Sequence, residues 1–196
     1  MDDIGILPKF EGTAIHDFWK SYYRYGREHG LCNAHLLREL TFVKERHKQA
    51  WADELAGLLL KMKATKERAI AKGKEFLSPA TLSRYRSLYE GLVQKGLKAN
   101  PYKPPPKKKR GRDKKTKPRN LIERFRDYAD DILRFFYDFK VPFDNNFSER
   151  DIRMMKVKQK ISGCFRSFDG ARFFARIRSF IVTARKQNIN VFKALK

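Results

Sequence analysis

The sequence is short of acidic residues, and this shortage decides which partners to expect. Asp and Glu number 22 against 45 Lys and Arg, which leaves a formal net charge of +23 over 196 residues. Such an excess repels itself in a compact chain unless an anion lies nearby. Nucleic acid is therefore the first partner to expect, ahead of an anionic membrane surface.

Cysteine and long apolar runs are scarce as well. The chain has two cysteines, Cys32 and Cys164, which argues against a disulfide framework and a CxxC metal knuckle. No run of 18 apolar residues exists, so we expect no membrane span. The start, MDDIGILPKF, has acids where a signal peptide has bases, and cytoplasmic residence is the default expectation. Apolar residues still make up 41% of the chain, enough to bury a core.

The first part of the chain, residues 1–44, reads as α/β. Short apolar runs at Phe10–Ile15 and Gly30–Cys32 predict two strands. Apolar residues at helical spacing from Leu36 to Val43 predict a helix after the second strand. The fold class expected is therefore α/β, mainly helical, with two short core strands.

The second part, residues 45–100, is expected to be a helical insertion. Two apolar stripes recur every three to four residues, and Ser78-Pro79 marks the start of the second. Two such stripes fit an antiparallel helical hairpin. The stripes are Trp51, Leu55, Leu58, Leu59 and Met62, then Leu82, Tyr85, Leu88, Tyr89 and Leu92.

Residues 101–119 read as a basic, proline-rich linker. Ten of these 19 residues are Lys or Arg and five are Pro, so the segment cannot bury a core. It is interpreted either as a flexible strap that binds phosphates or as a plain solubilising linker.

The last part, residues 120–196, is expected to consist of helices. One amphipathic helix is predicted from Leu121 to Phe139, and a cluster of Asp and Asn at 144–146 can cap a second. A final helix is expected over 170–187. Its inward face should carry Phe173, Phe174, Ile177, Phe180 and Ile181.

Two acidic residues could share a divalent metal. Asp17 follows the first predicted strand and Glu149 lies in the first turn of a predicted helix. Mg²⁺ or Mn²⁺ prefers such hard oxygen ligands and binds through few carboxylates plus substrate phosphates. The simpler interpretations are a turn or cap aspartate and a helix acid favoured by the helix dipole.

Other polar residues near these two have plain structural interpretations. Asn145 and Asn146 are expected to cap and shape the site rather than to bind metal. His16 and His35 are expected to be structural histidines. Cys32 and His35 have a CxxH spacing, but no second Cys/His pair stands at a distance that would complete a zinc site.

Basic residues crowd the segment after Glu149. From Asp144 to the end, 13 residues are basic and four are acidic. These side chains could neutralise DNA phosphates without reading sequence, or they could be a solvated basic face. The proposed DNA-binding residues are Arg150, Arg153, Lys156, Lys158 and Lys160.

Long passages of the sequence resemble one bacterial family, the insertion sequence 66 transposases. They are HDFWKSY from His16, CNAHLLREL from Cys32, PFDNNFSERDIRMMKVKQKISGCFRS from Pro142, and GARFFARIRSFIVTARKQNINVFKAL from Gly170. The passages keep the family's order and span nearly the whole chain. The DNNFSERDIR passage is the most specific of them.

The resemblance implies a ribonuclease-H-like fold with an Asp-Asp-Glu metal triad. Asp17 matches the second aspartate and Glu149 the glutamate. The implied activity is metal-dependent cleavage of transposon ends and strand transfer into target DNA, with DNA and a second copy of the chain as partners. Phe18 stands where the family usually has glycine.

The family's first aspartate lies upstream of the passage that matches Met1. We therefore expect this chain to be the C-terminal portion of a transposase catalytic domain, inactive by itself. The alternative function is a non-enzymatic DNA-binding remnant or regulator of transposition. A basic RNA-binding protein has only the charge in its favour.

Overall fold

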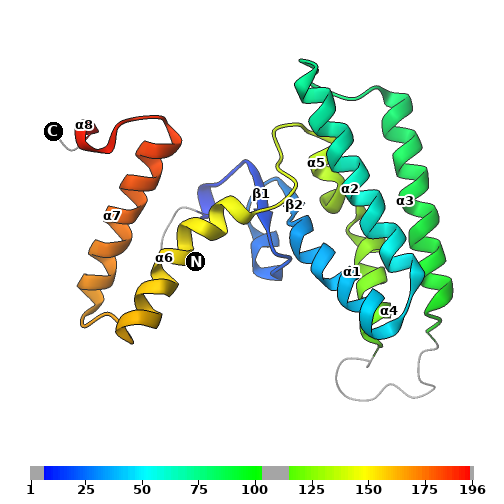
Figure 1. The fold of residues 1–196 in the computed structure, drawn as a ribbon, viewed down its shortest axis with the longest axis horizontal. Helices are drawn as coiled ribbons and strands as arrows, with labels where there is room; N and C mark the ends of the chain where they lie inside the picture. Colours follow the sequence, from blue (N-terminus) through cyan, green and yellow to red (C-terminus); the bar gives the residue numbers. More distant parts are fainter. Residues whose placement is uncertain (1–6, 103–114, 195–196) are drawn as a thin grey trace. The chain divides into compact units, whose positions relative to one another are not determined.

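The chain folds into two units, residues 1–145 and 146–196, in a computed structural model that describes residues 7–102 and 115–194 (Figure 1). Within those ranges it forms two parallel strands and eight α-helices, which confirms the mainly helical α/β class. No helix in the described ranges combines the length and the apolar character needed to cross a bilayer. Most of the predicted linker, 103–114, lies outside the described residues.

The sheet of the first unit has two strands, β1 (Thr13–His16) and β2 (Glu28–Leu31). They pair in parallel, and His16 stands opposite Leu31. Each strand lies within a few residues of its prediction. Because the strands are parallel, both carboxyl ends meet at one edge of the sheet.

Two 3₁₀ helices flank β1. They are η2 (Leu7–Lys9) before the strand and η3 (Lys20–Arg24) between the strands. The hydroxyl of Tyr23 in η3 donates to an Asp131 carboxylate oxygen at 2.9 Å, which ties the connection between the strands to a helix more than 100 residues later.

Three long helices follow the sheet: α1 (Asn33–His47), α2 (Ala50–Ala71) and α3 (Pro79–Ala99). Helices α2 and α3 run antiparallel, as the two stripes predicted (Figure 1). The stripe of α2 is buried at every predicted position. On α3 the buried side is shifted, since Val93 and Gly96 are buried while Leu88 is 48% exposed.

The helix expected from Leu121 to Phe139 is in fact two, α4 (Lys117–Asp127) and α5 (Ala129–Tyr137). They meet at Tyr128, whose φ of −120° and ψ of 31° interrupt the helix. The apolar stripe continues across the break, so the sequence pattern does not reveal it. Helix α5 packs against β2.

Helix α4 begins inside the range predicted to be a linker. Thr116 caps it by accepting the backbone N–H of Arg119 at 3.3 Å. The guanidinium of Arg119 donates to the carbonyl oxygens of Leu97 and Asn100 at 3.3 and 2.7 Å. This charge therefore closes the end of α3 and is not part of a free basic strap.

The second unit contains α6 (Asn146–Ser162), α7 (Phe168–Lys186) and the short α8 (Val191–Ala194). Ser167 caps α7 by accepting the Gly170 N–H at 3.0 Å. The expected inward face of α7 is wrong for three of its five residues: Phe173, Ile177 and Phe180 are 61%, 60% and 40% exposed. Ala184 is the one buried residue among those described in this unit.

The core of the first unit closes around a glycine contact between α3 and α4. A Cβ at Gly96 would stand 2.7 Å from the Ile122 side chain and 3.1 Å from the Trp51 ring, both of them buried. Helices α2, α3 and α4 come this close because the residue of α3 at the contact is a glycine and has no side chain. Gly91, five residues earlier on α3, is exposed, and a Cβ added to it would meet no atom within 4 Å.

We predict opposite effects for two Gly→Ala substitutions on this helix. G96A should lower the free energy of unfolding by about 1–3 kcal/mol because it overpacks the core. G91A, the matched control, should raise it by up to about 1 kcal/mol, since alanine favours a helix. Urea unfolding followed by circular dichroism measures both. Equal effects of the two substitutions would contradict the close approach at Gly96.

Candidate functional site

The carboxyl edge of the two-stranded sheet carries the first candidate ligand. Asp17 directly follows β1 and is exposed, and its Oδ1 accepts the backbone N–H of Trp19 at 3.3 Å. At the same edge, the N–H of Cys32 donates to the carbonyl oxygen of His16 at 2.9 Å. Asp17 thus projects from an ordered turn at the edge where parallel sheets usually bind ligands.

His16 supports this turn from inside the unit. It is 3% exposed, its Nδ1 accepts the Phe18 N–H at 3.2 Å, and its Nε2 lies 3.2 Å from Nδ1 of His29. Nδ1 accepts, so the proton of the neutral ring sits on Nε2 and points to His29. Burial, and then the neighbouring His29, lowers the pKa of His16 to about 4, while Asp17 acts weakly in the opposite direction. His16 is therefore a neutral structural residue near pH 7, as expected.

Phe18 adopts a backbone conformation that favours glycine. Its φ is +75°, in the left-handed region. A non-glycine residue there carries roughly 1–2 kcal/mol of strain. The ring is held by an edge-on contact with Tyr128 at 4.5 Å between centroids and by the guanidinium of Arg124 at 4.8 Å. Phe18 thus combines a strained backbone with favourable packing of its ring.

Cys32 and His35 lie at the start of α1, beyond the second strand. Cys32 is buried, and its Sγ accepts the backbone N–H of Asn145 at 3.2 Å. The N–H of His35 donates to the Cys32 carbonyl oxygen at 3.2 Å. Asn145 therefore meets the sheet edge through its backbone, and its role in shaping the site stays a prediction.

Glu149, the second candidate ligand, lies in the first turn of α6 and is half-buried. Asn146 is the first residue of that helix. The position near the helix N-terminus suits a carboxylate because of the helix dipole. Asp17 belongs to the first unit and Glu149 to the second, and their sharing of one metal stays a prediction.

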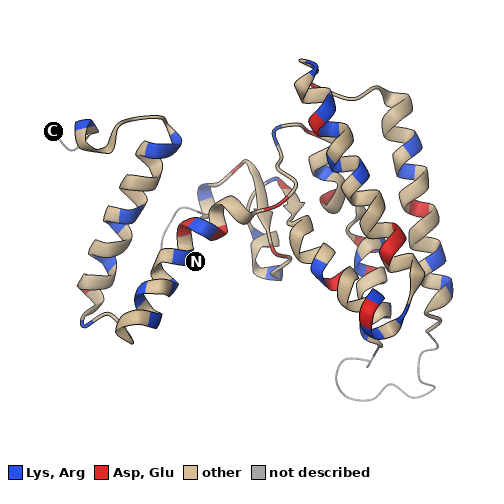
Figure 2. Ribbon diagram, viewed as in Figure 1, with Lys and Arg blue, Asp and Glu red and all other residues tan. Residues whose placement is uncertain are grey.

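The proposed DNA-binding residues all lie on α6 and are exposed. With about 100° of rotation per residue, positions 4, 7 and 11 after Glu149 share its face. These positions are Arg153, Lys156 and Lys160, which form a basic stripe with Glu149 at its N-terminal end. Lys158, which the sequence proposed as a DNA contact, lies about 180° from Glu149 on the opposite face and so falls outside this stripe. Figure 2 shows Lys and Arg along α6 and α7 with few acidic residues between them.

A pocket that the sequence did not reveal adjoins the turn after β1. It has a volume of about 570 Å³ and lies between that turn and α4. Residues from the two segments are about 100 positions apart in the chain, so spacing could not have joined them. No sequence pattern marked Trp19, which lies in the HDFW passage, as part of a pocket. The lining of this pocket includes Phe18, Trp19, Lys20, Glu123, Arg124 and Tyr128.

The chain matches one known protein family over most of its length. The model of the transposase IS66 family matches residues 4–173. The chain belongs to the IS66 transposase family. No curated protein and no solved structure matches it.

The family match confirms the resemblance drawn from the four sequence passages. The matched range contains the Asp17 turn, the helical hairpin and all of α6. It ends inside α7, so most of the GARFFARIRSFIV tail lies beyond it. This IS66 transposase chain therefore carries both candidate ligands within the region typical of the family.

We predict that the strain at Phe18 can be measured by comparing two truncations. F18A loses the ring contacts and keeps the strained φ, so it should lower the free energy of unfolding by about 2 kcal/mol. F18G loses the same contacts but tolerates φ +75°, so it should be about 1 kcal/mol more stable than F18A. Urea unfolding of the two variants tests this. If alanine is at least as stable as glycine here, the left-handed conformation is not kept in solution.

Proposed function

We propose that this chain acts on DNA as the catalytic part of an IS66 transposase, with Asp17 and Glu149 as carboxylate ligands of a divalent metal. The observation that supports it best is the family match over a range that includes both residues. A ribonuclease-H-like fold is part of the same proposal. The parallel pair β1–β2 with its ligand at the carboxyl edge agrees with such a fold.

The two side chains have the chemistry that Mg²⁺ or Mn²⁺ requires. Both offer hard carboxylate oxygens, and Asp17 is exposed on a turn that the Trp19 N–H and His16 keep in place. Such ions, when bound, activate a water for phosphodiester cleavage and stabilise the leaving oxygen. Asp17 and Glu149 would account for two of the triad's three carboxylates.

The basic stripe on α6 has a separate part in this proposal. Arg153, Lys156 and Lys160 follow Glu149 along one face, so a DNA backbone lying on that face would bring its phosphates to the glutamate end of the helix. Contacts of this kind hold DNA in register without reading its sequence. The alternative function, DNA binding without catalysis, needs only this stripe.

We predict that loss of the stripe weakens DNA binding in a salt-dependent way. The double variant K156A/K160A should bind duplex DNA more weakly, and the slope of log K against log salt should fall by about 2. K158A, on the opposite face of α6, should change neither quantity much. Fluorescence anisotropy over a series of salt concentrations measures both. An affinity that hardly changes with salt would rule out phosphate contacts.

We predict that the metal depends on both acids. Mn²⁺ binding, followed by electron paramagnetic resonance, should weaken about tenfold or more in D17N and in E149Q. D151N is the matched control, because Asp151 lies on the same helix in an ion pair with Lys186. If D17N and E149Q bind Mn²⁺ like the D151N control while duplex DNA still binds, the non-enzymatic alternative is favoured.

A further inference from the structure

The pocket beside Asp17 is lined in part by aromatic rings. Phe18, Trp19 and Tyr128 contribute rings to it. Trp19 is 57% exposed, and its ring lies edge-on to that of Tyr22 with 5.7 Å between the centroids. The other tryptophan, Trp51, is 2% exposed. A large exposed indole at the mouth of a pocket of about 570 Å³ offers a flat surface for another ring.

The four charged residues that line this pocket sum to no net charge, since Lys20 and Arg124 stand against Glu123 and Asp127. Arg124 pairs with Glu39 at 2.6 Å, and Glu123 pairs with Lys115 and Arg119 at 2.7 and 2.9 Å. Asp127, a further lining acid, pairs with Arg126 at 2.7 Å. A neutral aromatic pocket with polar groups at its rim suits a flat uncharged ring better than it suits a phosphate.

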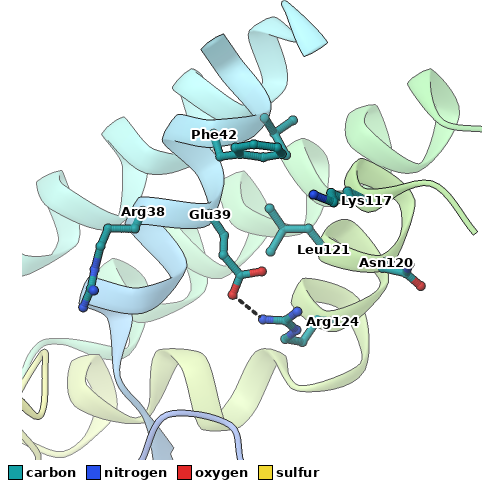
Figure 3. Close-up of a pocket in the computed structure, with 8 residues that line it drawn as sticks. Arg38, Glu39, Phe42, Lys117, Asn120, Leu121 and Arg124 are labelled. Carbon is teal, nitrogen blue, oxygen red and sulfur yellow. Dashed lines mark hydrogen bonds and ion pairs between the residues drawn. The ribbon is translucent and has the colours of Figure 1, made fainter. Parts of the chain in front are cut away.

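The neighbouring pocket has the opposite character. It lies between α1 and α4, has a volume of about 510 Å³, and shares Asn120 and Arg124 with the first (Figure 3). The one acidic residue in its lining, Glu39, forms an ion pair with Arg124. Arg38 and Lys117 also line it, and neither pairs with a carboxylate within the described part of the chain. This pocket therefore keeps two cations for an anion.

Lys117 and Phe42 define the outer side of the basic pocket. The Lys117 ammonium lies 4.8 Å from the centre of the Phe42 ring, and Phe42 is 39% exposed. Figure 3 shows the Glu39–Arg124 pair bridging α1 and α4. A neutral aromatic pocket next to a basic one matches the alternation of base and phosphate in a single strand.

We propose that this face of the first unit binds an unpaired DNA strand, with one base stacked on Trp19 beside Asp17 and neighbouring phosphates of the same strand at Lys117 and at Arg38. The proposal rests on the proposed function, since it takes DNA as the substrate. It adds that the strand at the Asp17 edge is held by an unstacked base and not by its backbone alone. Trp19 is then a positioning residue for the nucleotide next to the reacting phosphate.

Three DNA probes separate base stacking from phosphate binding. They are a short oligothymidylate, an abasic strand of the same length and backbone, and a duplex of that length. With the wild-type chain, the oligothymidylate should quench the exposed tryptophan and bind about tenfold or more tightly than the abasic strand. The abasic strand should leave the fluorescence nearly unchanged, because buried Trp51 is out of reach.

Variants then assign the effect to residues. W19A should lose the preference for the base-bearing strand, and W19F should keep part of it, since phenylalanine can still stack. F76A is the matched control, because Phe76 is 70% exposed at the turn between α2 and α3. R38A and K117A should weaken the oligothymidylate and the abasic strand alike, and each should lower the salt slope by about 1.

The outcomes distinguish this proposal from the one on which it rests. If W19A binds the oligothymidylate and the abasic strand with the wild-type ratio while both bind salt-dependently, base stacking is overturned and DNA binding stands. If none of the three probes binds even at low salt, the proposed function itself fails. Urea unfolding of W19A should match wild type, because an exposed side chain supports little of the core.

Discussion

A single buried amide connects the elements that surround the candidate site. Asn33 is fully buried at the start of α1, and its backbone N–H donates to the Phe143 carbonyl oxygen at 3.1 Å. Its Nδ2 donates to the Ile132 and Leu31 carbonyl oxygens at 3.1 and 3.4 Å. The end of β2, the middle of α5 and the segment after α5 therefore converge on one residue, the first two through its side chain and the third through its backbone. The orientation of the amide is determined too, because the reverse would set its oxygen against two carbonyl oxygens.

The hydrogen bonds of Asn33 are formed at a cost in free energy, because one of its own polar atoms is left without a partner in the described part of the chain. The Asn33 Oδ1 has no hydrogen-bond partner among the described residues, and a buried polar atom in that state costs about 1–3 kcal/mol. The two carbonyl oxygens that Asn33 satisfies would otherwise be buried in the same state. The turn of Asp17 depends on this framework, since β1 is held in place by its pairing with β2. The rings that line the pocket beside Asp17 depend in turn on how α4 and α5 meet at Tyr128.

Sequence patterns predicted the elements whose signal is local. The stripe of α2 identified its buried residues, and Ser78 marked the start of α3, because helical periodicity and capping act within a few residues. The break at Tyr128 was missed because the apolar pattern passes through it. The inward face of α7 was wrong because a stripe shows which side of a helix is apolar and not whether another element covers it.

The candidate site also has residues that a sequence signal marked and residues that only tertiary packing brings together. Asp17 and Glu149 were singled out by family resemblance, supported by a strand end and a helix start. The pocket of Trp19 and Arg124 was out of reach, since it joins residues about 100 positions apart through tertiary packing. The only sequence signal for the positive φ of Phe18 was the expectation, drawn from the family resemblance, of a glycine at its place.

The scarcity of buried residues in the second unit has a consequence for how the chain unfolds. Local stability follows the apolar area that a segment removes from water. The described part of this unit buries Ala184 alone, whereas the first unit encloses a continuous cluster of aromatic and aliphatic side chains. We therefore expect the amide hydrogens of α6 and α7 to exchange through openings much smaller than global unfolding. The helix that bears Glu149 is then expected to be an element of low local stability, and a ligand that binds it would stabilise it.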